Sequence, residues 1–191
     1  MKNKPVIVGI GELLWDMLPS GKKAGGAPVN FVYHASLLGA ESYAISAIGK
    51  DALGDEILQE LDKIKLSYFI ERVDYPTGTV LVQLKEGIPN YTIIENVAWD
   101  YIPATDEVKQ LARRTDAICF GTLAQRSAVS RSTIHEILSL VPQSAYRILD
   151  INIRQHFYSK QIIEESLRLC NVFKMNDDEL ELLRELFPLE G

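Results

Sequence analysis

A chain of 191 residues is long enough for one domain with a substantial core, and 47% hydrophobic with 24% charged residues is typical of a globular protein. The net charge of −6 argues against binding to nucleic acid, and no apolar run approaches the roughly 20 residues that span a bilayer. Glu12 and Asp16 interrupt the first apolar run too early for a signal peptide. Cys119 and Cys170 match no metal-binding spacing, so we expect reduced thiols and a cytoplasmic protein.

The first element is a continuous apolar run, residues 6–11, which predicts a strand buried on both faces of a parallel sheet. Glu12 to Asp16 follow it and place a carboxylate beyond the carboxyl end of the strand, where open α/β sheets bind ligands. Asp16 could accept hydrogen bonds from two hydroxyls, or it could be a solvated loop residue. The glycines of this region complete neither a dinucleotide-binding fingerprint nor a Walker loop.

The next segment, Gly25-Gly26-Ala27-Pro28-Val29-Asn30, predicts a tight turn that leads into a helix ending at Gly39. Such a turn offers the free N–H groups of a helix N-terminus to a polar ligand. Asn30 could donate and accept hydrogen bonds toward the same ligand. The alternative is a tight loop with a helix started by proline and no ligand. The spacing predicts one apolar helix face, made of Phe31, Ala35 and Leu38.

Gly-Gly-Ala-Pro-x-Asn, followed by an Ala- and Leu-rich helix ending in Leu-Gly, resembles the first signature of the PfkB, or ribokinase-like, family of carbohydrate kinases. The Ala-Pro pair resembles the fructokinases of that family. The resemblance implies an α/β fold, a three-layer α/β/α sandwich with a mostly parallel sheet and a small β-sheet lid. It also implies a sugar site to which Asp16, Gly25, Gly26 and Asn30 contribute, with the Asp16 carboxylate on the sugar hydroxyls.

Residues 42–48 predict a second strand, and Gly49-Lys50-Asp51-Ala52-Leu53-Gly54 follows it. The Gly-x-Asp-x-x-Gly spacing again resembles the family, and we favour a helix-capping role for Asp51 over a ligand role. The helix that follows is predicted to bury Ile57, Leu61 and Ile64.

From residue 69 to 96 the pattern changes to strict alternation, which predicts half-exposed strands around 79–85 and 91–94 with a turn at 87–90. An antiparallel hairpin in a chain that otherwise alternates strand and helix suggests a separate small sheet. In the family, lid segments matching about 12–24 and 69–101 cover the sugar and exclude water. The family's lids also pair between subunits, which implies a homodimer through the lid. An edge hairpin without motion is the alternative.

The alternation of helix and strand then resumes, with a helix from Thr105 to about Arg114 and a buried strand at 117–120. The strand ends next to Gln125 and Arg126, which the resemblance places as second-rank candidates for the sugar pocket. A capping-box pattern at Thr133 predicts the start of the next helix, with His135 on its surface.

The strand at 147–150 leads into Asp150-Ile151-Asn152-Ile153-Arg154. This Asp-x-Asn-x-Arg pattern resembles a family motif near the phosphate path, so Asn152 and Arg154 are candidates for ATP binding. An arginine there could stabilise charge on the transferring phosphoryl group. An internal ion pair between Arg154 and Asp150 is the alternative.

The last part of the chain predicts an inward-facing helix stripe of Ile163, Leu167 and Cys170, a strand at 172–175, and a helix burying Leu180, Leu183 and Phe187. Asn176 and Glu179 form a capping-box pattern at the start of the last helix. They also match the family's Asn-x-x-Glu, which is associated with Mg²⁺ through its water shell. By the same resemblance, Lys174 and Asn176 are candidates for ATP binding.

The resemblance therefore implies a sugar kinase that uses ATP and Mg²⁺, with fructose to fructose 6-phosphate favoured. The alternatives are a kinase for another sugar or a keto-deoxy sugar acid, and a non-catalytic sugar-binding or dimerisation module.

Residues 1–191 resemble only the N-terminal part of the family's domain, because no Gly-Ala-Gly-Asp segment with its catalytic base follows Asn176. By the resemblance, that base is expected beyond Gly191, so that no residue of this chain is assigned as the base. We expect the chain alone to be inactive, as an engineered truncation, a proteolytic fragment or the product of an interrupted gene.

Overall fold

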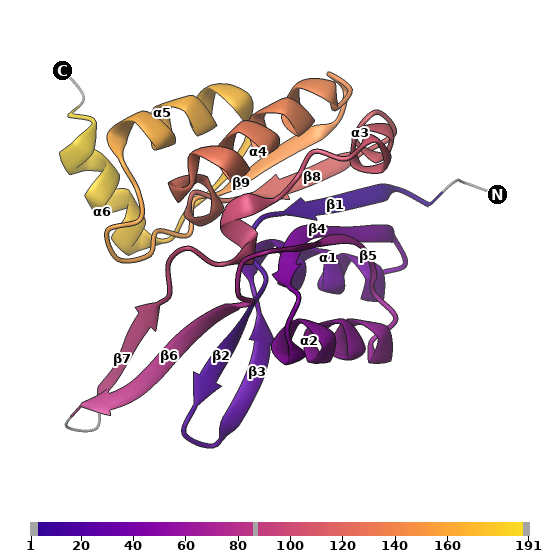
Figure 1. Cartoon of the computed structure of the whole chain (residues 1–191). Coiled ribbons are helices and arrows are strands. Elements are labelled where there is room, and N and C mark those ends of the chain that lie inside the picture. The colour runs from indigo at the N-terminus through magenta and orange to yellow at the C-terminus, as the bar shows by residue number, and fades with distance from the viewer. Residues whose placement is uncertain (1–3, 86–87, 189–191) are drawn as a thin grey trace.

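The computed structural model describes residues 4–85 and 88–188, which form an α/β fold with two sheets (Figure 1). The main sheet has six strands, and every neighbouring pair is parallel. In spatial order its strands are β10 (Val172–Lys174), β9 (Tyr146–Asp150), β8 (Ala117–Phe120), β1 (Val6–Ile10), β4 (Glu41–Gly49) and β5 (Ser67–Val73). Strand order reverses beside β1, because the chain first builds β4 and β5 on one side of β1 and later β8, β9 and β10 on the other.

The second sheet projects from one end of the main sheet (Figure 1). Its order is β3 (Gly21–Gly25), β2 (Leu14–Leu18), β6 (Gly78–Lys85) and β7 (Ile88–Ile93). The pairs β2–β3 and β6–β7 are antiparallel, whereas β2 and β6 run parallel. This is the small sheet predicted as a lid, and we call it the lid sheet.

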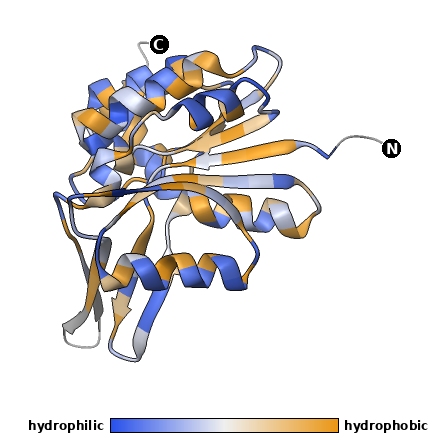
Figure 2. Cartoon of the chain, turned by 45° about the vertical axis from the view of Figure 1, so that its right-hand side comes forward, coloured by the Kyte–Doolittle hydropathy of each residue, from blue (hydrophilic) through white to orange (hydrophobic). Residues whose placement is uncertain are grey.

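Helices cover both faces of the main sheet, which gives the expected three layers (Figure 1). They are α1 (Ala27–Leu37), α2 (Ala52–Lys63), α3 (Asp106–Ala112), α4 (Ala128–Leu140), α5 (Lys160–Leu169) and α6 (Asp177–Leu186). Strand β4 shows how the layers are divided. Its Ala44 and Ile48 pack with α1 and α2, while Ile45 and Ala47 face the core shared with α3 and α4. Strands β1 and β8 in the middle of the main sheet are mostly hydrophobic, as burial on both faces requires, and the helices are hydrophobic on one side and hydrophilic on the other (Figure 2).

The structure corrects the predicted lid boundary. The segment from residue 69 does not open the lid, because β5 pairs with β4 in the main sheet. β5 is the edge strand of the main sheet, and each of its residues is half-buried or exposed, as in the half-exposed strands predicted for the lid. Residues 88–90 of the predicted turn belong to β7, and Gly87 lies outside the described residues. The lid sheet thus consists of residues 14–25 and 78–93 within the described part of the chain.

Gly191, beyond which the catalytic base is expected, also lies outside the described residues. The structure therefore does not test the expected position of the base. The last helix among the described residues is α6, which ends at Leu186.

Three helix predictions were wrong in detail. Helix α1 buries Pro28, Val29 and Val32 instead of the predicted face, and Leu38 is 89% exposed. Ile64 follows the last turn of α2 and is 41% exposed. Helix α4 begins after its N-cap Ser127, so the capping-box pattern at Thr133 lies inside the helix, where the Thr133 hydroxyl donates to the carbonyl of Ile102.

Asp51 joins the main sheet to the lid sheet. Its Oδ1 caps α2 by accepting from the Gly54 N–H at 2.8 Å, which confirms the predicted capping role. The same carboxylate accepts from the Thr77 N–H at 2.8 Å and from the Thr77 hydroxyl at 2.6 Å. Thr77 immediately precedes β6. Asp51 therefore fixes the point where the chain enters the lid.

Replacing Asp51 with alanine should lower the free energy of unfolding by about 2–3 kcal/mol, because one helix cap and the anchor of Thr77 are lost together. Urea denaturation followed by circular dichroism measures this change. Asp74→Ala is the matched control, since Asp74 makes only an exposed ion pair with Lys50 and its loss should cost under about 0.5 kcal/mol. Equal effects of the two substitutions would contradict the anchoring role.

Candidate functional site

A cavity of about 640 Å³ lies where the lid sheet meets the carboxyl end of the main sheet. Its wall comes from the segment after β1, from β2, from the start of α1 and from the segments after β8 and β9. This is the position where strand order reverses, which is the usual ligand position in open α/β sheets. The polar side chains used below are Glu12, Asp16, Asn30, Asn152 and Arg154.

The predicted glycine pair fits against this wall with no room for a side chain. Gly26 has φ of 131°, a backbone conformation that L-residues rarely adopt, and a Cβ there would overlap the carbonyl oxygen of Glu12. A Cβ on Gly25 would lie 2.8 Å from Oδ2 of Asp16. The two glycines therefore let the chain pass between the backbone of Glu12 and the carboxylate of Asp16.

The N-terminus of α1 is fixed by the strand it follows. The Ala27 N–H donates to Oε1 of Glu12 at 2.9 Å, and the Asn30 N–H donates to the Gly26 carbonyl at 3.0 Å. A Cβ on Gly9 of β1 would overlap the backbone of Pro28, so α1 approaches β1 closely. As a result, the positive end of the helix points toward the cavity.

Asp16 and Asn30 line the same cavity, as their predicted sharing of one ligand requires. Within the described residues, neither the Asp16 carboxylate nor the Asn30 side-chain amide has a hydrogen-bond partner. Partial burial raises the pKa of Asp16 above its ordinary value of 3.8, and the nearby Lys23 ammonium opposes this rise. Asp16 and Asn30 are thus available to a ligand that offers hydroxyl groups.

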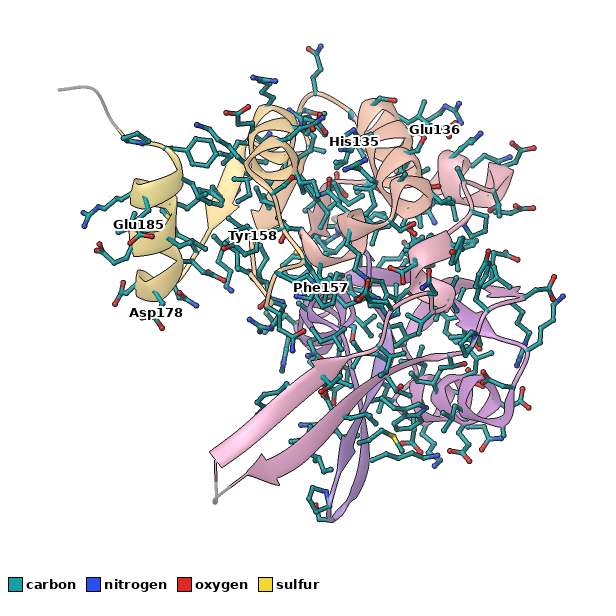
Figure 3. All side chains as sticks on the ribbon, turned by 60° about the vertical axis from the view of Figure 1, so that its left-hand side comes forward. His135, Glu136, Phe157, Tyr158, Asp178 and Glu185 are labelled. Atoms are coloured by element: carbon teal, nitrogen blue, oxygen red, sulfur yellow. The ribbon has the colours of Figure 1, made fainter. Side chains whose placement is uncertain are left out.

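Asn152 and Arg154 reach the cavity from the loop between β9 and α5. Arg154 is exposed and donates to the carbonyl of Ile153 at 3.0 Å. Asp150 pairs instead with Lys174 at 2.8 Å, so the structure does not form the alternative Arg154–Asp150 ion pair. The loop carrying Phe157 and Tyr158 lies between the main sheet and the lid, and Gln155 Nε2 donates to the Tyr91 carbonyl of β7 (Figure 3).

The structure does not bring Gln125 and Arg126 into this cavity. Gln125 is fully buried, and its amide nitrogen donates to the Gly121 carbonyl and the Ser166 hydroxyl, both at 2.8 Å. His135, expected on the surface, is half-buried and lies 3.2 Å from Oε1 of Gln125. Gln125 therefore serves the packing beneath the site.

Arg126 instead lines a separate hollow of about 350 Å³. It forms a buried bidentate ion pair with Asp100, at 2.8 and 2.9 Å, and donates to the Ile94 carbonyl at 2.7 Å. Its guanidinium lies between the Trp99 and Phe157 rings. Arg126 consequently holds the exit from β7 in place and does not face the sugar candidates.

The Asn176–Glu179 pattern forms a complete capping box. Oδ1 of Asn176 accepts from the Glu179 N–H, and Oε2 of Glu179 accepts from the Asn176 N–H, each at 2.8 Å. Oε1 of Glu179 also accepts from the Ile153 N–H at 2.8 Å. Both carboxylate oxygens are therefore engaged by the backbone. Residues 4–85 and 88–188 contain no cluster of three or more His, Cys, Asp or Glu side chains suited to a metal ion.

Asp178 and Glu185 project outward from the same helix, α6, away from the cavity (Figure 3).

No helix among the described residues is long and apolar enough to cross a membrane.

The sequence analysis missed Glu12 as a cavity residue. Only 3% of Glu12 is exposed, and its Oε2 has no hydrogen-bond partner among the described residues. Burial raises the pKa of Glu12, against the lowering effects of backbone hydrogen bonds and of Arg154. A glutamate two residues after the end of a mostly buried strand was the available signal, because a buried carboxylate needs a structural or ligand partner.

The model of the pfkB family of carbohydrate kinases matches residues 20–187, so this chain belongs to that family. An uncharacterized sugar kinase from Pyrococcus horikoshii is 27% identical over 194 residues, covering 92% of this chain and 63% of that protein. Its crystal structure has a TM-score of 0.85 with this chain over 94% of the chain's length. A fructokinase of Salmonella typhimurium is 25% identical over 186 residues, covering 90% of this chain and 60% of that protein.

The crystal structure of a fructokinase with bound ATP from Xylella fastidiosa shares the fold, with a TM-score of 0.84 at 20% identity. It is aligned over 96% of this chain and 64% of its own. The predicted ribokinase-like fold is thereby confirmed. The chain spans less than two thirds of the length of each of these relatives.

Gly26→Ala should lower the free energy of unfolding by about 3 kcal/mol or more, because it adds a backbone overlap to the strain of positive φ. Gly21→Ala is the matched control. Gly21 has φ of 133°, but a Cβ there meets nothing within 4 Å, so strain alone should cost about 1 kcal/mol. Urea denaturation measures both values, and equal losses would contradict the close contact between Gly26 and Glu12.

Proposed function

We propose that this chain forms the sugar-binding part of an ATP-dependent sugar kinase, with fructose to fructose 6-phosphate as the first candidate reaction. The observation that carries the proposal is the shared cavity of Asp16 and Asn30, whose side chains lie without partners among the described residues at the carboxyl end of the main sheet. A carboxylate and an amide placed together offer the acceptors and donors that a vicinal pair of hydroxyls requires.

In this proposal, Asp16 accepts from the sugar hydroxyls, and Asn30 orients the sugar from the first turn of α1. Gly25 and Gly26 allow the chain to pass close to Glu12 and to the Asp16 carboxylate, which a Cβ at either position would displace. The lid sheet covers the sugar, and Val80 and Ile93 supply apolar wall on that side. Phosphoryl transfer gains from such cover, because water would otherwise compete with the sugar for ATP.

ATP would supply the phosphoryl group, and Mg²⁺ would neutralise charge on it as it transfers. The residues present fit a phosphate on one side of the cavity, since Asn152 and Arg154 line it and Arg154 is exposed. We propose Lys174 and Asn176 as more distant contributors to ATP binding. Because both oxygens of Glu179 are held by backbone N–H groups, Asn176 and Glu179 fit a role toward Mg²⁺ only through water.

The base that takes the proton from the sugar hydroxyl is proposed to lie beyond Gly191, in the part of the longer relatives that this chain does not match. We therefore expect the 191-residue chain to bind sugar without phosphorylating it.

The edge strands of the lid sheet are β3 and β7 within the described residues, and such edges suit pairing with a second copy of the chain, as proposed from the family resemblance. Sedimentation of the chain with and without sugar tests that pairing.

The binding proposal is tested by titrating the 191-residue chain with fructose, ribose and a keto-deoxy sugar acid, followed by NMR. Asp16→Asn and Asn30→Ala should each weaken binding of the preferred sugar at least tenfold, because each removes hydrogen bonds to hydroxyls. Asp116→Asn is the control, because Asp116 accepts from the Val6 N–H at the opposite end of β1. The proposal fails if no sugar binds, or if the control weakens binding as much as the site variants do.

Sugar affinity should also depend on pH. Hydroxyls donate to the ionised Asp16, so the affinity should be full above the pKa of Asp16 and fall as the pH drops through it. Because partial burial raises this pKa, the loss should begin at a higher pH than for an ordinary aspartate. Glu12 and Arg154 line the same cavity, so Asp16→Asn is needed to assign the effect. An unchanged pH profile in Asp16→Asn would rule Asp16 out as the titrating group.

A further inference from the structure

The strongest feature that the proposed roles leave unused is the second oxygen of Glu12. Oε1 of Glu12 accepts from the Ala27 N–H at 2.9 Å, whereas Oε2 is shielded from solvent without a partner among the described residues. A buried carboxyl oxygen left unpaired destabilises the fold, because it has lost its water without gaining a protein partner. The other buried side-chain atoms without partners in the described chain belong to Ser42, Trp99 and Arg126, and none of these residues lines the 640 Å³ cavity.

The surroundings of Glu12 hold its side chain in one orientation. The residue follows Gly11, is 3% exposed, and is tied through Oε1 to the first residue of α1. Its backbone carbonyl lies directly against Gly26. A carboxyl group with one oxygen fixed on a helix N-terminus and the other free is pre-organised for a ligand, because little side-chain entropy is lost on binding.

Glu12 and Asp16 lie on the two sides of the glycine pair, since Gly26 contacts the first and Gly25 the second. Both residues line the cavity; the Asp16 side chain is half-buried there, and Oε2 of Glu12 is shielded from solvent. The pKa of Glu12 is raised by burial, but a hydroxyl can donate to an ionised carboxylate and accept from a protonated one. A hydroxyl is thus the ligand group that satisfies Oε2 in either state.

We propose that Oε2 of Glu12 forms a hydrogen bond with a hydroxyl of the bound sugar, different from those held by Asp16, and so helps to select the sugar. This inference rests on the sugar-binding function proposed above. Glu12 then has two roles: Oε1 fixes the start of α1, and Oε2 binds one hydroxyl of the sugar.

The test compares fructose with its monodeoxy analogues, each lacking one hydroxyl, in NMR titrations of the 191-residue chain. In the unsubstituted chain, the analogue that lacks the hydroxyl contacted by Glu12 should bind about tenfold more weakly than fructose. In Glu12→Ala this penalty should disappear for that analogue alone. Glu12→Gln keeps an oxygen for the Ala27 N–H and should reduce the same penalty at least threefold, which covers the case that Glu12→Ala does not fold.

Asp16→Asn should abolish the penalty for a different analogue, and Asp116→Asn should leave every penalty unchanged. A purely structural role of Glu12 predicts that its variants weaken fructose and all analogues by one common factor, and that result would overturn the inference while leaving the proposed function intact. Failure of the unsubstituted chain to bind any of the sugars tested would instead remove the proposed function, and this inference with it.

Discussion

The close approach of α1 to the end of β1 is the constraint on which the candidate site depends. Three contacts enforce it: the Ala27 N–H on Oε1 of Glu12, the carbonyl of Glu12 against Gly26, and the backbone of Pro28 against Gly9. Each contact requires a residue type that few others can replace. Because α1 begins here, Asn30 in its first turn lines the same cavity as Asp16 on β2, although one residue belongs to a helix beside the main sheet and the other to the lid sheet.

The lid sheet is attached to the rest of the protein at both ends of the β6–β7 hairpin. Asp51 holds Thr77 where the chain enters β6, and the next residue, Gly78, packs against the Trp99 ring. Arg126 holds the Ile94 carbonyl where the chain leaves β7. Both attachments are hydrogen bonds to buried or half-buried residues, namely the Asp51 carboxylate and the Ile94 carbonyl. The lid residues that face the cavity are thereby kept near the sugar candidates.

Local chemistry decided which features could be predicted from the sequence. Strands β1 and β8 are continuous apolar runs, and the caps at Asp51 and Asn176 use side chains whose partners lie within three residues. Those predictions were confirmed. The start of α4 was misplaced because Thr133 and Glu136 imitate a cap inside the helix. The start of β5 was assigned to the lid, although β5 is the half-exposed edge strand of the main sheet.

The placement of Asp16 and Asn30 in one cavity was predictable, because a family motif and a strand end mark the two residues; their binding roles stay a prediction. The positions of Gln125 and Arg126 could not be predicted from the sequence, because a side chain after a strand can point either toward the cavity or into the core. Here Gln125 forms a hydrogen bond with Ser166 on α5, and Arg126 forms an ion pair with Asp100 before α3. Neither partner is close in sequence to the residue it binds. Glu12 was missed for the converse reason, since its unpaired oxygen becomes visible only when the positions of α1 and β1 are known together.

The capping box of α6 links the last part of the chain to the same cavity. Asn152 and Gln155 have φ of 40° and 49°, which is strained for residues other than glycine, so the β9–α5 loop needs external support. Glu179 gives that support through the Ile153 N–H, while its other oxygen closes the capping box. In the proposed kinase, the Asn-x-x-Glu pattern would act without a direct metal bond, by setting the position of the loop that carries Asn152 and Arg154.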